Sequence, residues 1–226
     1  MEPLHVVFLL FPNVTQLDLT GPAQVLSRLG NVKIDLIWKT LDPVPTDAGF
    51  SIMPTAALDD VQRADILCVP GGFGTVAVIE DAYVLDWVRR VGEDATWVTS
   101  VCTGSLVLAA AGLLTGYRAA CHWASRHQLT WFGVEPVNER WAIDRNRVTG
   151  GGVTAGIDFA LALTALIRGE DHANFVQLSI EYDPHPPFDS GTPDKADAAT
   201  LARYRDMIAK NAGDRETRVR AVADRL

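Results

Sequence analysis

Residues 99–105 (TSVCTGS) contain the side chain best suited to covalent chemistry, that of Cys102. The apolar run 97–101 before it reads as a buried strand, and small residues typical of a helix start follow within two positions. Such a turn strains the backbone of the junction residue and projects its side chain outward. The helix start behind it favours thiolate over thiol. We therefore expect Cys102 to be a nucleophile, with a buried structural thiol as the alternative.

Asp18 is the second candidate, in the apolar segment 16–22 (QLDLTGP) that follows the first predicted strand. The carboxyl ends of parallel strands gather at one edge of a sheet, so Asp18 and Cys102 could meet there. A desolvated aspartate beside a thiolate would have a raised pKa, which suits a proton donor. The alternative is that Asp18 caps a helix that starts near Pro22.

Two glycine turns and a histidine could complete such a site. The turn at 70–74 (PGGFG) follows a predicted strand, and its backbone N–H groups could form an oxyanion hole. It fits a dinucleotide fingerprint poorly, because Pro70 breaks the strand-to-turn geometry. The glycines at 150–152 open a helix and either allow close packing or let a substrate approach the backbone. His122 could be a general base or a hydrogen-bonded structural residue, and no side-chain spacing indicates a metal.

Composition limits the classes of partner. The chain has 226 residues, 48% of them hydrophobic, and a net charge of −8, which suits one globular domain and disfavours binding to nucleic acid or anionic membranes. The apolar runs are too short for a signal peptide or a membrane span. Three cysteines are too few for a disulfide framework. We expect a cytoplasmic protein with reduced thiols.

Short β-branched runs alternate with helical patterns along the chain, which predicts an α/β fold: a doubly wound, mostly parallel sheet between helices, as in flavodoxin-like domains. The predicted domain covers residues 1–182. Residues 183–197 read as a proline-rich surface loop, and residues 198–226 as a charged helix that packs on the domain or on a partner subunit. The predicted strands are 6–11, 33–38, 66–69 and 97–101, with helices at 22–29, 75–79 and 83–91 between them.

Taken together, these motifs resemble the ThiJ/PfpI superfamily, whose fold is like that of class I glutamine amidotransferases. The resemblance covers residues 4–182 and implies the same α/β fold. Within the superfamily the chain is most similar to the isocyanide hydratase branch. Those enzymes are homodimeric hydro-lyases that need no cofactor and convert an isocyanide and water to an N-substituted formamide. The motifs that carry the resemblance lie at 10–12, 16–22, 69–72, 100–105, 122–123 and 149–158.

The resemblance implies a role for each matched residue. Cys102 would attack the terminal carbon of the isocyanide, and Asp18 would hold the thiol and protonate that carbon to give a thioimidate. Thr103 would supply a hydroxyl and a backbone N–H beside the reacting group, and Gly72 an amide. Gly151 would leave room for a helix motion that follows cysteine modification.

Two other functions remain open at this stage. The same motifs occur in the sensory domains of transcription regulators, so the chain could be a ligand-sensing module without the DNA-binding half. It could also be a cysteine-dependent glyoxalase or deglycase, although such relatives usually carry glutamate in place of Asp18. A peptidase is disfavoured because its histidine would stand where Thr103 stands.

Overall fold

A seven-stranded sheet forms the centre of the computed structural model, which describes residues 2–226 and, for residues 211 and 212, the backbone alone. The strand order is β10-β11-β7-β6-β1-β2-β5, and every neighbouring pair is parallel except β10 with β11. The predicted mostly parallel α/β sheet of a single domain is confirmed. The strands are β1 (Leu4–Leu9), β2 (Val32–Trp38), β5 (Ala56–Ala57), β6 (Ile66–Val69), β7 (Trp97–Val101), β10 (Trp141–Asp144) and β11 (Arg147–Gly150).

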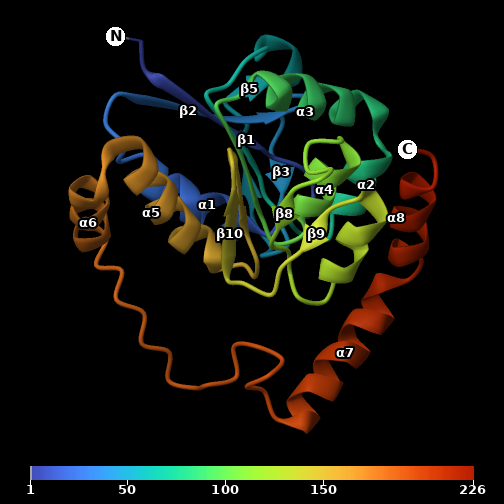
Figure 1. Ribbon diagram of the computed structural model, residues 1–226. Coiled ribbons are helices and arrows are strands. Elements are labelled where there is room, and N and C mark those ends of the chain that lie inside the picture. The colour runs from blue at the N-terminus through green and yellow to red at the C-terminus, as the bar shows by residue number, and fades with distance from the viewer. Residues whose placement is uncertain (1) are drawn as a thin grey trace.

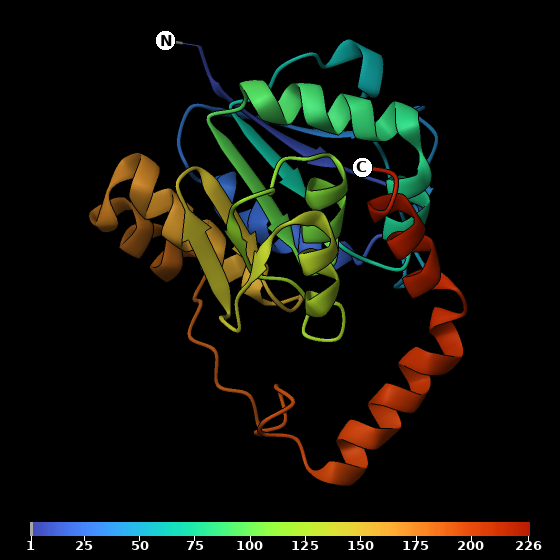
Figure 2. The same ribbon diagram turned by 45° about the vertical axis from the view of Figure 1, so that its right-hand side comes forward.

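Helices cover both faces of this sheet because parallel neighbours need long crossover connections (Figure 1). Helices α1 (Gln16–Leu26) and α5 (Ala155–Arg168) lie against one face, with α6 (Glu170–Ser179) packed outside α5. Helices α2 (Thr75–Glu80), α3 (Ala82–Asp94) and α4 (Gly104–Ala110) lie on the other face, and Figure 2 shows the same two layers after rotation. The short helices η1 and η2 span Leu58–Asp60 and Arg126–Phe132, and two small sheets pair β3 (Val44–Pro45) with β4 (Ser51–Ile52) and β8 (Arg118–Ala119) with β9 (Glu135–Pro136).

The central strands are apolar on both faces because both faces are covered. The side chains of Val6 to Leu9 on β1 and of Ile66 and Leu67 on β6 are completely buried. Near-continuous apolar runs of this kind are typical of interior parallel strands. Because β1, β6 and β7 are parallel neighbours, the segments that follow them lie at one edge of the sheet.

Helix α1 begins at Gln16, six residues before the start that we expected from Pro22. Proline lies inside the helix, where it removes one backbone hydrogen bond. The lost bond is offset by close packing: a Cβ at Gly21 would be 3.2 Å from Ile157, and one at Gly156 would be 3.0 Å from Pro22. Asp18 therefore lies in the first turn of α1 and does not cap a later helix.

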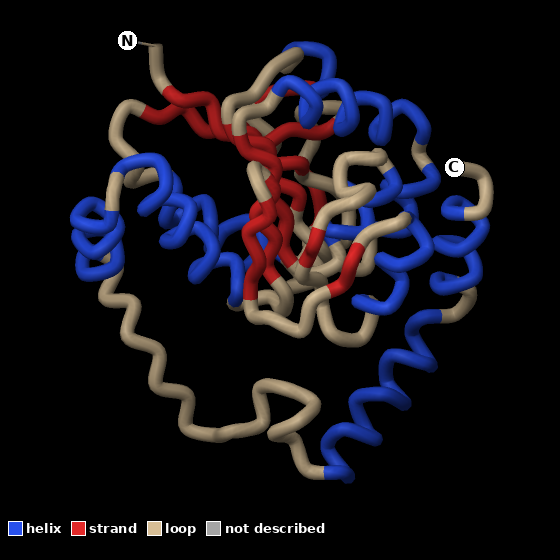
Figure 3. Tube along the Cα trace, in the orientation of Figure 1, coloured by secondary structure: helices blue, strands red, loops and turns tan. Residues whose placement is uncertain are grey.

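The chain after α6 leaves the domain and returns to its opposite side. Residues 181–197 form no helix or strand, as Figure 3 shows, and the following helix α7 (Ala198–Ala212) rises diagonally at the lower right of Figure 1. We expected one helix over 198–226, but the chain forms two, because Gly213 adopts a φ of +52° that ends α7.

The second of these helices, α8 (Arg215–Ala223), packs on the domain itself. Its Val219 and Val222 are buried, and Arg218 forms a bidentate salt bridge with Glu80 of α2. In residues 2–226 no helix is both long and apolar enough to cross a membrane.

Helix α4 can approach the sheet only because Gly104 lacks a side chain. A Cβ there would overlap the carbonyl oxygen of Val69 at the end of β6. We predict that Gly104→Ala lowers the free energy of unfolding by about 2 kcal/mol or more, the cost of overpacking against backbone. Urea unfolding measures this. Gly191→Ala, at a loop position with open space around it, is the control and should change the stability little. Equal stability of the two variants would contradict the packing described here.

Candidate active site

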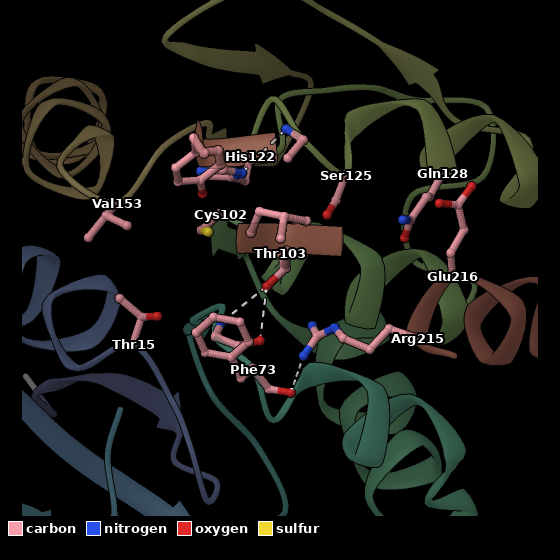
Figure 4. Close-up of a pocket in the computed structure, with 14 residues that line it drawn as sticks. Thr15, Phe73, Cys102, Thr103, His122, Ser125, Gln128, Val153, Arg215 and Glu216 are labelled. Atoms are coloured by element: carbon pink, nitrogen blue, oxygen red, sulfur yellow. Dashed lines mark hydrogen bonds between the residues drawn. The ribbon is translucent and has the colours of Figure 1, made fainter. Parts of the chain in front are cut away.

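Cys102 occupies the turn between β7 and α4, with a φ of +58° that only a few non-glycine residues adopt. Hydrogen bonds hold the strained residue on both sides: its N–H donates to the Gly150 carbonyl at 3.1 Å, and its carbonyl accepts from the His122 N–H at 3.4 Å. The sulfur faces a pocket, and Figure 4 shows it next to Thr103 among the lining residues. The turn therefore presents the thiol to a ligand while the backbone stays fixed.

Buried hydroxyls brace the same turn. The Ser100 and Ser105 hydroxyls share a hydrogen bond of 2.8 Å, which joins the end of β7 to the start of α4. Ser105 also donates to the Ala120 carbonyl at 2.6 Å, and the Ala120 N–H donates to the Thr149 hydroxyl at 2.8 Å. These bonds lie in the interior, where replacing them with water is costly, so they fix the turn between β7 and α4.

Asp18 lies behind Cys102 and is only 1% exposed. Its Oδ2 accepts a hydrogen bond of 2.9 Å from the Gly71 N–H, while Oδ1 is buried and makes no hydrogen bond of ordinary geometry with the described residues. Burial raises the pKa of Asp18 to about 7, although the Gly71 amide and the weakly donating Cys102 thiol both lower it. Near neutral pH this carboxyl can both hold and release a proton.

The Cys102 thiol responds to the same burial. Desolvation raises its pKa well above the ordinary value, and the adjacent Asp18 raises it further, while Thr103 lowers it through its backbone N–H and its hydroxyl. Two acids that are buried together and repel each other's charge titrate as a pair. One negative charge and one proton divided between carboxyl and thiol is therefore the arrangement that this site favours at neutral pH.

The glycine turn after β6 fits between Asp18 and Thr103. A Cβ on Gly71 would lie 2.6 Å from the Thr103 N and 2.9 Å from Asp18 Oδ2, so no other residue fits there. Gly72 has a φ of +134°, and a Cβ on it would be 2.5 Å from the Asn13 carbonyl oxygen and the Thr15 N. Both glycines are needed for close backbone approach.

The pocket above Cys102 has a volume of about 190 Å³. Apolar side chains from three segments form much of its wall, namely Phe73, Val153, and Tyr204 with Ile208 of α7. Tyr204 of α7 also packs on the rings of His122 and Trp123, with centroids 6.3 and 5.2 Å away. The helices that follow the long loop thus complete the pocket, since Arg215 and Glu216 of α8 line it as well.

The structure brings four of the predicted site residues to this pocket. Cys102, Thr103, Gly72 and His122 line it, and Asp18 lies directly behind the cysteine. The Gly72 N–H donates to the Thr103 hydroxyl at 3.0 Å, so a direct role of that amide toward a reacting group stays a prediction.

The surroundings of His122 and Gly151 differ from those of the other predicted site residues. Burial lowers the pKa of His122, and its Nδ1 accepts a hydrogen bond of 3.3 Å from the Ala124 N–H, so the neutral ring offers the pocket an N–H rather than a base. Gly151 does not line the pocket. Its N–H donates to the Arg140 carbonyl at 2.8 Å, and a Cβ on it would be 3.1 Å from that oxygen.

Several residues that shape the site were missed from the sequence. Gly71 supplies the amide that binds Asp18, a contact that the PGG motif alone does not indicate. Tyr204 and Ile208 lie four positions apart on one helix face, but the sequence does not show what they contact. Nothing in the sequence around Arg215 indicated that it belongs to the site. Among residues 2–226, no cluster of histidine, cysteine or carboxylate side chains is arranged to hold a metal.

Comparison with known proteins agrees with this geometry. Residues 4–166 match the model of the DJ-1/PfpI family. An isonitrile hydratase of Pseudomonas putida is 50% identical over 206 residues, which cover 91% of this chain and 90% of the relative. The transcriptional regulator CdhR of Pseudomonas aeruginosa is 32% identical over 77% of this chain and 53% of its own length. A crystal structure of a ThiJ/PfpI family protein from Pseudomonas syringae superposes with a TM-score of 0.93 at 40% identity, covering 99% of this chain and 91% of that one.

The raised pKa of Asp18 predicts a pH-dependent stability. The folded state binds the Asp18 proton more tightly than the unfolded state, so this carboxyl lowers the free energy of unfolding as the pH rises from about 4 to about 7. Asp18→Asn, which does not titrate, should lose that decline and exceed the wild type by about 2–4 kcal/mol at pH 8. Urea unfolding between pH 4 and 8 tests this. Asp206→Asn, on the exposed side of α7, is the control, and a wild-type profile for Asp18→Asn would contradict the assignment.

Proposed function

This chain belongs to the DJ-1/PfpI family, and we propose that within this family it is an isocyanide hydratase. Such an enzyme is a hydro-lyase that adds water to an isocyanide to give an N-substituted formamide. The observation that carries the proposal is the pairing of a buried nucleophilic thiol with a carboxyl whose pKa is near 7. The relative from Pseudomonas putida, which is half identical over nearly the whole chain, bears the corresponding name.

The first step joins the pair to the substrate. The Cys102 thiolate donates an electron pair to the terminal carbon of the isocyanide and forms a carbon–sulfur bond. The thiol passes its proton to the Asp18 carboxylate as the sulfur attacks, negative charge develops on the isocyanide carbon, and Asp18 transfers the proton there. The product is a thioimidate in which carbon bears hydrogen, sulfur and a double bond to nitrogen. A neutral acid beside the thiolate is what this step requires.

The second step returns the enzyme to its starting state. The Asp18 carboxylate removes a proton from water as its oxygen adds to the thioimidate carbon, and that proton passes to the nitrogen. The tetrahedral adduct then expels the Cys102 thiolate as the C=O bond forms, and Asp18 takes up the hydroxyl proton. One water is consumed, one formamide is released, and the pair again holds one proton.

The pocket suits an apolar N-substituent. Phe73, Val153, Tyr204 and Ile208 surround the space above the sulfur, and a cavity of about 190 Å³ holds a small ring or chain. Thr103 would serve the reacting end through its backbone N–H and hydroxyl, both of which act on Cys102. No step of the reaction as written requires a metal or an organic cofactor.

We further propose a homodimer that works in the cytoplasm. The exposed face of α6 supports the dimer, since Leu178 and Phe175 expose 80% and 65% of their surface and lie on one side of the helix. Apolar patches of this kind commonly mark an interface. The three free thiols are consistent with a reducing compartment.

The reaction predicts the behaviour of three variants. Purified protein mixed with an aryl isocyanide should form the formamide, which absorbance follows. Cys102→Ala should lose activity by about 10⁴-fold or more, because the bond-forming atom is gone. Asp18→Asn should lose about 10²–10⁴-fold, because an amide does not donate the proton. Cys68→Ala, at a second buried thiol, is the control and should keep the activity.

Other outcomes identify the alternatives. Absence of turnover by protein with an intact Cys102 would rule out the hydratase. Stoichiometric binding heat without product would indicate a ligand sensor, and faster consumption of methylglyoxal than of isocyanide would indicate a glyoxalase or deglycase.

The dimer has its own test. Leu178→Arg should convert the protein from dimer to monomer in size-exclusion chromatography with light scattering, because it places a charge on the proposed apolar interface. Leu41→Arg, at an exposed leucine away from α6, is the control. A wild-type protein that elutes as a monomer at micromolar concentration would contradict the proposal.

A further inference from the structure

Arg215 brings a positive charge to the pocket from the far end of the chain. It is the first residue of α8, 113 positions after Cys102, and it is half-buried. Its Nη1 donates to the Phe73 carbonyl at 2.5 Å, its Nη2 donates to the Thr75 hydroxyl at 3.3 Å, and its guanidinium lies 5.4 Å from the centre of the Phe73 ring. These three contacts fix the guanidinium at the pocket wall (Figure 4).

No carboxylate of the described residues lies within salt-bridge distance of this cation. The acidic side chains on either side of Arg215 have other partners: Glu216 pairs with His127 at 3.2 Å, and Asp214 with Arg218 at 3.6 Å. Of the residues that line the pocket, Arg215 is the only one with a positive charge at neutral pH, because burial lowers the pKa of His122. Its charge is therefore available to an anion in the pocket.

The anion is the Cys102 thiolate, which lines the same pocket as Arg215. The ionisable groups that line the pocket or act electrostatically on Cys102 are Asp18 of α1, Cys121 and His122 after β8, Tyr204 of α7, and Arg215 with Glu216 of α8. Asp18 and Cys121 both disfavour the thiolate. The attraction between the Arg215 cation and the Cys102 thiolate opposes them, and it raises the pKa of Arg215 against the lowering caused by burial.

The hydrogen bonds also define a chain of donors from Arg215 to the sulfur. Since Arg215 donates to the Thr75 oxygen, the Thr75 hydroxyl directs its own proton elsewhere, to the Gly72 carbonyl at 2.8 Å or to the Thr103 hydroxyl oxygen at 3.3 Å. The Gly72 N–H also donates to the Thr103 oxygen at 3.0 Å, and the Gly72 carbonyl is a long second acceptor for the Thr103 proton at 3.4 Å. These contacts favour the Cys102 sulfur as the acceptor of the Thr103 proton, and this hydroxyl lowers the pKa of the thiol.

We propose that Arg215 is a positioning residue for the reaction, which stabilises the Cys102 thiolate by its charge and, through Thr75, orients the Thr103 hydroxyl toward the sulfur. The inference rests on the proposed function for its role in turnover. Its effect on the thiol itself does not depend on which electrophile the enzyme uses. Helix α8 thus contributes to the chemistry as well as to the wall of the pocket.

The test measures the thiol directly. The rate of Cys102 alkylation by iodoacetamide is followed by mass spectrometry of its peptide between pH 6 and 10. Arg215→Gln should slow alkylation at pH 7 by about tenfold and move the profile up by about one pH unit, the effect of one nearby charge. Thr75→Val, which keeps the charge and breaks the donor chain, should give a smaller shift in the same direction. Arg215→Lys should fall between Arg215→Gln and the wild type, because it keeps the charge but not both hydrogen bonds.

The matched control is Arg220→Gln, which removes a cation from the same helix at a site where the guanidinium pairs with Asp224 and stacks on Trp131. It should leave the profile unchanged. In turnover of an aryl isocyanide, Arg215→Gln should lower kcat by about tenfold and change KM by less than about threefold, since the residue acts on the thiol.

Each outcome has one meaning. Alkylation profiles of Arg215→Gln and Thr75→Val that superimpose on the wild type would overturn the inference, whatever the activity. If Arg215→Gln does not fold, the profiles of Arg215→Lys and Thr75→Val decide the matter. A wild-type protein that does not hydrate isocyanides, while the alkylation shifts appear as expected, would overturn the proposed function and leave the role of Arg215 toward the thiol intact.

Discussion

A carboxyl and a thiol buried side by side cannot both be ionised, and the rest of the site follows from that restriction. Asp18 is almost completely removed from water and has one good hydrogen bond, so its proton is held near neutral pH. Cys102 cannot lose its proton to water easily, because burial and the neighbouring carboxyl both oppose a second charge. The proton must then move within the pair or onto a substrate. Such a site favours an electrophile that needs a nucleophile and a proton on the same atom.

The Asp18–Cys102 pair requires neighbouring backbone segments to approach one another more closely than a residue with a side chain would allow. The Gly71 amide reaches Asp18 only because no Cβ separates it from Thr103, and Gly104 lets α4 start directly against the end of β6. The strain of Cys102 is sustained by hydrogen bonds from two segments, one at the end of β11 and one after β8. The core of the α/β fold thus fixes the distance between carboxyl and sulfur, and neither group has to move far to react.

Local chemistry could be predicted from the sequence, whereas contacts between distant segments could not. Cys102 stood out because a strand and a helix meet there without a linker, and the alternation of buried strands with helices gave the parallel sheet that brings Asp18 near it. The start of α1 was misplaced because Pro22 is a strong local signal for a helix start, while the packing of Gly21 and Gly156 that outweighs it joins segments 135 residues apart. The break at Gly213 was missed because a glycine within a charged helix is locally tolerated. No local pattern could show that Arg215 lines the same pocket as Cys102.

The domain and the chain after α6 contribute differently to the site, for a physical reason. Helix α8 is anchored by Val219, Val222 and the pairing of Arg218 with Glu80, so it can hold Arg215 at a fixed distance from the sulfur. None of the described side chains of α7 is buried, yet Tyr204 and Ile208 form the outer wall of the pocket. Substitutions on that wall therefore change the space offered to an N-substituent without disturbing the core, whereas substitutions at Asp18 or Gly71 alter the proton pair itself. In the proposed reaction, α7 would set the selectivity among isocyanides and the Asp18–Cys102 pair the reactivity, and Arg215 would contribute both to the pocket wall and to the state of the thiol.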